Sequence, residues 1–329
     1  MTIKEQILNL FRSSPEITVK EVVDRTGASK QMVHIAMKQL LDEGLVLKLG
    51  RTPKTVYRIN TSPSKTKELS PSYSVTKNEL DFLQKHFIVV TEIGNLLEGM
   101  DAFVHWCEQR KLPVKKTLDE YRITKKKLDG LYDNKGNVNG SAKLQNTKEF
   151  KEIHLNQLFY LDFYAIERFG KTRLGTILHY AKQGQNKFLM KMLVEDIHDR
   201  IMQFVTQHKA DAICFIPPTI RREVQLMKYL QTHIRIPLPV VDVKKMSGLI
   251  PVPQKSLNKM DERIRNAENT FAVTETGKFK HIILIDDAVG SGATLNQIAG
   301  KIKSKKIASK VTGLAVVGSL KGFDVVTDV

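Results

Sequence analysis

Two neighbouring acids followed by a short glycine loop are the residues of this chain whose types and spacing best suit chemistry. Asp286 and Asp287 follow the apolar run Ile282–Ile285, and Gly290-Ser291-Gly292 stands just before a helix expected from Thr294. The apolar run predicts a buried strand of a parallel sheet, and ligands of such sheets bind outside the carboxyl ends of the strands. Glycines let backbone N–H groups approach an anion, and the helix turns its positive end toward it. The loop therefore suits a phosphate, and the acids suit sugar hydroxyls or a hydrated Mg²⁺.

This segment resembles the phosphoribosyl pyrophosphate (PRPP) motif of type I phosphoribosyltransferases, in which an apolar strand precedes two acids, two variable residues and Thr-Thr-Gly-x-Thr. Gly290 and Ser291 stand where the family has its two threonines, whereas Gly292 and Thr294 match. The resemblance implies that the acids hold the ribose hydroxyls of PRPP and that the loop holds its 5′-phosphate. It implies Mg²⁺ as a cofactor carried by PRPP, with no direct protein ligand. The implied PRPP-binding set is Asp286, Asp287, Ala288, Val289, Gly290, Ser291, Gly292, Ala293 and Thr294. A plain strand-to-helix turn with a solvated aspartate cap is the alternative, but a cap needs one acid and not two.

Segments before this motif resemble the ComF-like branch of the same family, over about the last 160 residues. The branch carries Gln-x-x-Leu, Glu-Arg-x-x-Asn and a phenylalanine before its PRPP strand, and a helix with leucine and lysine further upstream. It also has a Pro-rich turn followed by Arg-Gly-Phe-Asn-Gln, of which this chain keeps the first and last residues but not the central three. The matching segments are Gln254–Leu257, Glu262–Asn266, Phe271, Pro217–Gln225 and Ile177–Lys182.

Three arginines are the candidates for catalysis if the site is that of an enzyme. The implied reaction displaces pyrophosphate at ribose C1 through an oxocarbenium-like state, which needs positioning and charge stabilisation more than a covalent nucleophile. Arg221 and Arg222 suit the leaving pyrophosphate, because guanidinium groups bind phosphate oxygens through paired hydrogen bonds. Arg263 lies in the Glu-Arg-x-x-Asn segment, which we interpret as a loop that closes over the site. Surface positions without a catalytic role are the alternative for all three.

The first 60 residues predict three short helices and a basic hairpin. Thr18 and Ser29 are placed to cap the second and third helices, and Gly44 to end the third. Strands are expected over 45–49 and 55–59, around a turn that contains Arg51 and Lys54.

This arrangement resembles the winged helix-turn-helix of bacterial transcription regulators, in which the third helix enters the major groove of DNA. Glutamine and lysine can bond base edges, and lysine and serine can bond phosphates. The residues expected to bind nucleic acid are Ser29, Lys30, Gln31, His34 and Lys38 on the helix and Arg51 and Lys54 on the wing. A winged helix that contacts only proteins is the alternative.

Composition supports a polyanionic partner. The chain has 329 residues with 52 basic and 35 acidic side chains, a net charge of +17, which favours nucleic acid or phosphate-rich ligands. No apolar run is long enough to span a bilayer and no leader is apparent, so a cytoplasmic, bacterial protein without a membrane partner is expected. Cys107 and Cys214 show no metal-ligand spacing and are expected to be buried free thiols in a reducing compartment.

The fold class expected is α/β: a C-terminal phosphoribosyltransferase fold with a parallel sheet, joined to the winged helix through a helical connector. The boundaries are 1–60 for the winged helix, 61–75 for a Ser/Pro/Lys linker, 76–150 for the connector and 151–329 for the phosphoribosyltransferase-like domain. The connector offers core contacts, contacts within a homo-oligomer, or a docking surface for a protein partner.

Three functions are compatible with this organisation. The first is a nucleic-acid-associated phosphoribosyltransferase that binds PRPP with Mg²⁺ and transfers the phosphoribosyl group to an unknown acceptor. The second is a PRPP-sensing transcription regulator without turnover, because the domain order resembles the purine operon repressors of Gram-positive bacteria. The third is an effector or toxin of a retron-type anti-phage system or another DNA-handling system, in which ComF-like and related domains occur.

Overall fold

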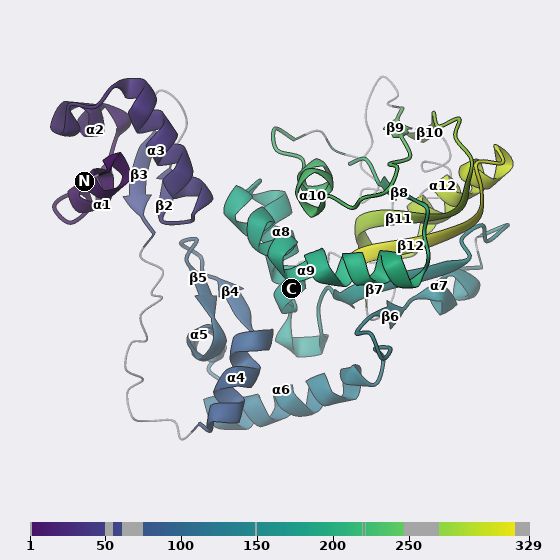
Figure 1. Cartoon of the computed structure of the whole chain (residues 1–329). Helices are drawn as coiled ribbons and strands as arrows, with labels where there is room; N and C mark the ends of the chain where they lie inside the picture. The colour runs from purple at the N-terminus through teal and green to yellow at the C-terminus, as the bar shows by residue number, and fades with distance from the viewer. Residues whose placement is uncertain are drawn as a thin grey trace.

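A computed structural model of the protein describes residues 2–49, 55–60, 75–148, 150–218, 220, 222–246 and 270–319 (Figure 1). These residues form a small N-terminal domain and a larger mixed α/β body. No helix among them is both long enough and apolar enough to cross a membrane.

The N-terminal domain consists of three helices and a three-stranded antiparallel sheet. Its elements are α1 (Ile3–Leu10), β1 (Glu16–Ile17), α2 (Val19–Thr26), α3 (Lys30–Asp42), β2 (Val46–Leu49) and β3 (Val56–Ile59), with the strands in the order β1-β3-β2. Thr18 caps α2 and Ser29 caps α3, each accepting a hydrogen bond from a backbone N–H of the first turn, as predicted. Ile7, Val33 and Leu40 are fully buried between the helices and the sheet. The domain therefore has a core of its own.

Residues 75–148 contain helices, but they are not helical throughout. The elements are α4 (Lys77–His86), β4 (Ile88–Val90), β5 (Leu96–Glu98), α5 (Gly99–Gln109), α6 (Val114–Asp129), β6 (Val138–Asn139) and α7 (Ser141–Asn146). The helical prediction was wrong at β4 and β5, which form an antiparallel hairpin. The run Ile88-Val89-Val90 is β-branched and suits a strand, and Gly94 takes a φ of +83° in the turn.

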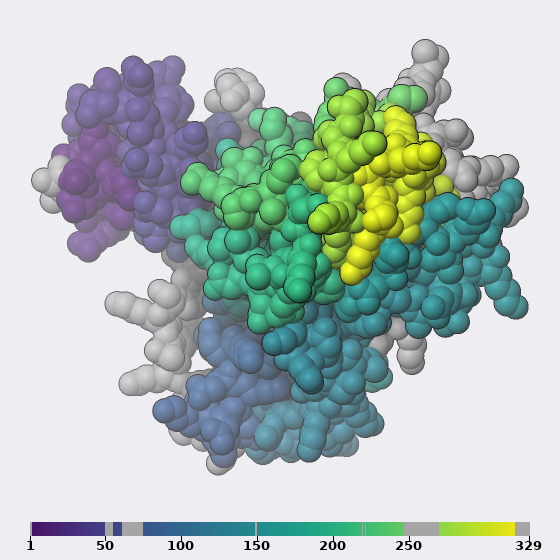
Figure 2. All heavy atoms as spheres, turned by 45° about the vertical axis from the view of Figure 1, so that its right-hand side comes forward, coloured from purple at the N-terminus to yellow at the C-terminus, as the bar shows by residue number. Residues whose placement is uncertain are grey.

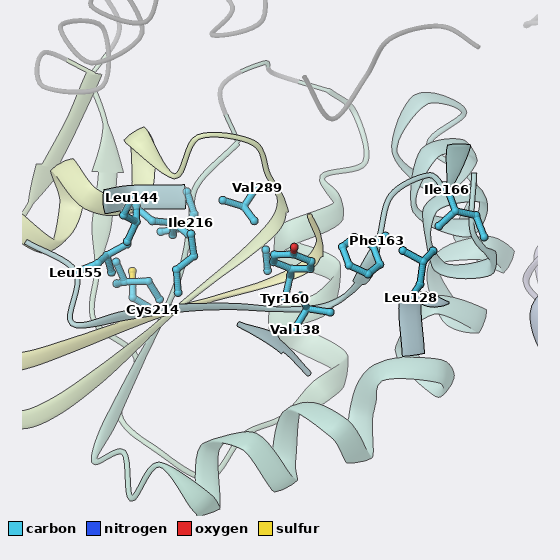
Figure 3. Packing of buried hydrophobic residues seen from close by; sticks show 14 of the residues in the cluster. Leu128, Val138, Leu144, Leu155, Tyr160, Phe163, Ile166, Cys214, Ile216 and Val289 are labelled. Atoms are coloured by element: carbon cyan, nitrogen blue, oxygen red, sulfur yellow. The ribbon is translucent and has the colours of Figure 1, made fainter. Parts of the chain in front are cut away.

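The helices of this region share one hydrophobic core with the sheet that follows (Figure 3). Tyr121 of α6 is packed against Phe169, with ring centroids 5.0 Å apart. Leu128, at the end of α6, belongs to the same cluster as Phe163 and Ile166 from the C-terminal part of the chain. Residues 75–148 are therefore one wall of the α/β body.

The main sheet has five strands in the order β6-β7-β12-β11-β8, and all but the edge strand β6 are parallel. The elements are β7 (Gln157–Phe163), the 3₁₀ turn η1 (Glu167–Phe169), α8 (Arg173–Gln183), α9 (Lys187–Gln207), β8 (Ala212–Phe215), α10 (Leu226–Ile234), β9 (Val243–Lys245), β10 (Phe271–Val273), β11 (Phe279–Val289), α12 (Ala293–Ser304) and β12 (Ala308–Gly318). The strands predicted from Ile282–Ile285 and from residues 211–216 are both present as β11 and β8.

Helices cover both faces of this sheet. Ile283 and Ile285 of β11 are packed with residues of α8, α9 and α10, whereas Ile282 and Leu284 are packed with α12 and the 75–148 region. All four side chains are fully buried, because a central parallel strand has no solvent-facing side. The order of layers is therefore helices, sheet, helices.

The direction of chain travel across the sheet reverses between β8 and β11. After β8 the chain forms a parallel bridge from Val240 to Ile213 on one side of β8, whereas β11 pairs with the other side of β8. Such a reversal opens a crevice outside the carboxyl ends of the two strands, where open α/β sheets bind ligands. Topology therefore points to the ends of β8 and β11, where Asp286 and Asp287 lie.

Candidate functional site

The two acids lie in the C-terminal part of β11, beside the end of β8. Ile285 pairs with Phe215, and the backbone N–H of Ile216 donates to the carbonyl of Ile285 at 2.9 Å. Side chains alternate along a strand, so Asp286 and Asp287 leave the sheet on opposite faces. Pairing with β8 stops at Ile285, so both acids lie just beyond the end of β8, while β11 continues beside β12 to Val289.

Asp287 forms an ion pair with Lys182, which lies in the last turn of α8. Only 7% of Asp287 is exposed, and a buried carboxylate needs a partner of this kind to remain charged. Lys182 belongs to the helix segment Ile177–Lys182 that resembles the ComF-like branch, but the sequence alone gave it no role at the acids. The fold brings the helix end and the strand end together.

Asp286 has an unusual protonation equilibrium. Burial raises the pKa of Asp286 to about 7, and the neighbouring Asp287 carboxylate acts in the same direction, while Lys182 opposes both. One oxygen of Asp286 accepts a hydrogen bond from the backbone N–H of Asp287 at 2.8 Å. A carboxyl with this pKa can be charged or neutral near physiological pH, so its charge depends on what occupies the crevice.

The loop after β11 is shaped by glycine. Gly292 has a φ of +81° and is the N-cap of α12. The helix starts at Ala293, one residue before the predicted position. The Ser291 hydroxyl is buried and accepts from the backbone N–H of Ala293 at 3.3 Å. The first N–H groups of a helix have no acceptor within the helix. Those of α12 follow the loop at the carboxyl edge, where an anion can bind them.

The loop is held in place by two elements distant in sequence. A Cβ atom on Gly292 would lie 2.8 Å from Cδ2 of Leu144 in α7 and 3.3 Å from Cδ2 of Leu158 in β7. Asn296, fully buried in α12, accepts from the backbone N–H groups of His154 and Leu155 and donates to the carbonyl of Glu152. Neither Leu144 nor Asn296 stands out in the sequence as a residue that supports the site.

Of the three candidate arginines, Arg222 alone lies among the described residues, and Arg221 and Arg263 lie outside them. The Arg222 guanidinium donates to Oε1 of Gln183 at 2.8 Å, and the backbone N–H of Val224 donates to Oε1 of Gln185 at the same distance. The segment after β8 is thereby tied to the turn between α8 and α9, next to Lys182. The matching segments Gln254–Leu257 and Glu262–Asn266 also lie outside the described residues.

A Mg²⁺ ion can be tested against this donor set. Within the described ranges, no three His, Cys, Asp or Glu side chains gather as a ready metal site. Mg²⁺ is commonly bound through one or two carboxylates together with substrate phosphates. Asp286 and Asp287, next to a loop suited to phosphate, fit that mode of binding.

The N-terminal domain presents a second candidate site on α3. Ser29, Lys30, Gln31, His34 and Lys38 are all exposed, as expected for a helix face that reads DNA. The hydroxyl of Ser29 also caps the helix. Ile35 is 53% exposed on the same face, and apolar side chains of recognition helices can contact thymine methyl groups. Arg51 and Lys54, the predicted wing contacts, lie outside the described residues.

The N-terminal domain lies against the α/β body (Figure 2), and α3 contacts α9. A Cβ atom on Gly44 would lie 2.6 Å from the ring of Phe188, at the start of α9. The charge of Asp42 also helps to raise the pKa of Tyr229 in α10, after the larger effect of burial. The contact involves the C-terminal end of α3, whereas the proposed DNA-binding residues lie toward its N-terminal end.

Comparisons with known proteins identify the N-terminal domain. Residues 2–46 match the family model described as winged helix-turn-helix DNA-binding, so this part of the chain is a winged helix-turn-helix of the DNA-binding type. No curated protein matches the chain. Among solved structures, a purine phosphoribosyltransferase from Pyrococcus horikoshii Ot3 is similar at 15% identity, over 41% of this chain and 93% of that chain, with a TM-score of 0.22. A likeness of that size does not establish a shared fold.

Proposed function

We propose that the chain is a DNA-binding protein whose α/β body binds PRPP with Mg²⁺ and transfers its phosphoribosyl group to an acceptor with release of pyrophosphate. The observation that carries the proposal is the carboxyl edge of β8 and β11. There, a buried and a half-buried acid, a glycine-shaped loop and a helix N-terminus meet at the point where strand order reverses. This combination suits a ribose phosphate better than a free anion, because carboxylates repel phosphate but accept hydrogen bonds from hydroxyls.

The residues divide into those that hold the sugar and those that hold its phosphate. Asp286 and Asp287 accept hydrogen bonds from ribose hydroxyls, and the backbone N–H groups of the loop and of α12 bind the 5′-phosphate. Asp286 and Asp287 are the carboxylates that would face Mg²⁺ carried by PRPP, and the ion would supply charge neutralisation of the pyrophosphate group. The pair of acids also lies beside the place where positive charge develops on the ribose ring, which lowers the barrier to departure of pyrophosphate.

Of the candidate arginines, Arg222 is the one among the described residues, and we assign it to binding the pyrophosphate group. Its guanidinium is held by the neutral side chain of Gln183 and has no carboxylate partner among the described residues. The guanidinium can exchange this amide oxygen for a phosphate oxygen at little cost, because its hydrogen bond to an anionic phosphate is stronger than its bond to a neutral amide.

The proposal is tested by binding and turnover with the whole protein. The double variant Asp286→Asn/Asp287→Asn should lose PRPP binding in calorimetry with Mg²⁺ while its circular dichroism is retained. The matched control is Asp24→Asn/Asp199→Asn, which removes two exposed carboxylates and should bind as the wild type does. Unchanged affinity in the folded double variant would contradict the proposed site, and absence of pyrophosphate release with any acceptor would contradict transfer.

A second function is favoured by the contact between Gly44 and Phe188. A PRPP sensor without turnover needs a physical connection between the ligand site and the DNA-binding domain, and this contact joins α3 to the helix pair that carries Lys182. Titration of PRPP with and without saturating DNA, and of DNA with and without PRPP, distinguishes the two functions. Equal coupling in both directions without turnover would support the sensor, because binding couplings are reciprocal.

A further inference from the structure

A lysine that nothing in the sequence singles out is hydrogen-bonded to Ser319, the residue after β12, next to the end of β11. Lys143 belongs to α7, the short helix whose Leu144 is packed directly on Gly292. The helix therefore touches the loop at the residue that begins α12.

Strand register places the Lys143 amine level with the start of that loop. Val289 of β11 pairs with Gly318 of β12, so Ser319 stands beside Gly290. The backbone N–H of Ser319 donates to the carbonyl of Val289 at 3.2 Å. The Nζ atom of Lys143 donates to the Ser319 hydroxyl at 2.8 Å and also to the Ser319 carbonyl. The ammonium group is thus bound to Ser319, which is itself hydrogen-bonded to Val289, the residue just before the loop.

The Lys143 ammonium lacks a counter-charge within the part of the chain that the structure describes. It lies 5.3 Å from the ring centroid of Tyr160, and none of the ion pairs among these residues includes it. Burial lowers the pKa of Lys143 to about 8, since a cation withdrawn from water without a carboxylate is disfavoured. A phosphate in the loop would provide the missing negative charge.

We propose that Lys143 is a phosphate-binding residue of the site, which holds the 5′-phosphate of the bound ribose phosphate from the side of β12, opposite the N-terminus of α12. The inference rests on the proposed function, because it names a further ligand for the same loop. The Ser319 oxygens accept hydrogen bonds from the amine while the loop is free, and the phosphate takes over one or more of its three N–H donors. Loop amides and one ammonium then share the charge of the phosphate.

The test uses Lys143→Met in the full chain, with ribose 5-phosphate, PRPP and pyrophosphate as probes in calorimetry. Methionine keeps the unbranched stem over Tyr160 and removes the charge. Affinity for ribose 5-phosphate and for PRPP should fall alike, by roughly 10- to 100-fold, the usual worth of a charged hydrogen bond. Affinity for pyrophosphate should not change. Lys148→Met, an exposed lysine two residues beyond α7, is the matched control and should bind each probe as the wild type does.

Thermal unfolding separates a ligand role from a structural one. If Lys143 serves mainly to anchor Ser319, Lys143→Met should lower the melting temperature, and that result with unchanged affinity would overturn the inference. If it serves the phosphate, the variant should melt at the same temperature or higher, because a half-buried charge without a carboxylate partner has been removed. Loss of affinity for PRPP but not for ribose 5-phosphate would also overturn the assignment to the 5′-phosphate. A wild type that binds neither sugar would refute the proposed function itself, whereas normal binding by Lys143→Met would refute the lysine alone.

Discussion

Gly292 should tolerate no side chain, and the structure separates the two reasons for this. Its φ of +81° costs an L-residue about 1–2 kcal/mol. In addition, a Cβ atom would lie 2.8 Å from the Leu144 side chain and 3.3 Å from that of Leu158, both almost fully buried. Forcing a methyl group into a packed core costs about 1–3 kcal/mol. Gly292→Ala should therefore lower the free energy of unfolding by about 2–5 kcal/mol.

Gly94 provides the matched control in the same α/β body. Its φ is +83°, almost that of Gly292, but no atom lies within 4 Å of the place a Cβ would take. Gly94→Ala should therefore show the backbone cost alone, about 1–2 kcal/mol. The difference between the two variants in urea unfolding measures the contact between α7 and the phosphate loop.

A third variant tests whether the close approach of Leu144 causes the extra cost of Gly292→Ala. Leu144→Ala costs about 2–5 kcal/mol by itself because it leaves a cavity. Combined with Gly292→Ala it should cost less than the sum of the two, by about 1–3 kcal/mol, since the new methyl group then has room. If Gly292→Ala were no more destabilising than Gly94→Ala, or if the costs simply added, the packing of α7 on the loop would be wrong, and with it the placement of Lys143.

Three further perturbations address the acids, the DNA face and the connection between domains. PRPP affinity should fall as pH drops through about 7 and Asp286 takes up a proton. The pKa of Asp286 is raised in the folded state, so its contribution to stability is present at low pH and is lost as pH rises toward 7; Lys182→Met should move both midpoints upward, as paired binding and unfolding titrations would reveal. Lys30→Ala/Lys38→Ala should reduce the slope of log affinity for DNA against log salt concentration by about two units if each lysine meets one phosphate, and an unchanged slope would remove them from the interface. Phe188→Ala should reduce any mutual effect of DNA and PRPP on affinity, and full coupling in that variant would show that the contact with Gly44 does not carry it.

The features that the sequence predicted correctly are local ones. The buried strand Ile282–Ile285 follows from an unbroken apolar run, and the helix caps Thr18 and Ser29 follow from a hydroxyl in front of amphipathic spacing. Each is determined by residues within a few positions of one another. The same reasoning placed Gly290–Gly292 in a turn, because these residues stand between a predicted strand with its two acids and a predicted helix.

The features that the sequence could not supply depend on contacts between distant segments. Lys182 meets Asp287 only because α8 ends at the carboxyl edge of β11, and Asn296 anchors α12 to residues 152–155 only because the two are adjacent in space. Lys143 is one lysine among many in a basic chain, and nothing in its neighbourhood in the sequence marks it. The β4–β5 hairpin was missed for a different reason, since its apolar residues also satisfy helical spacing, and only the β-branched run and Gly94 favour a strand pair.

The two domains that carry the candidate sites meet at the turn between α8 and α9. On one side its Gln183 and Gln185 hold Arg222 and the backbone of Val224, beside the crevice. On the other side Phe188, the second residue of α9, fills the space that only a glycine at position 44 leaves open. A pyrophosphate that draws Arg222 toward itself must break the hydrogen bond from Arg222 to Gln183. The turn beside the end of α3 then loses one of the two hydrogen bonds, to Arg222 and to Val224, that join it to the segment after β8. Coupling needs an element whose arrangement both ligands affect, and among the described residues this turn contacts both domains directly.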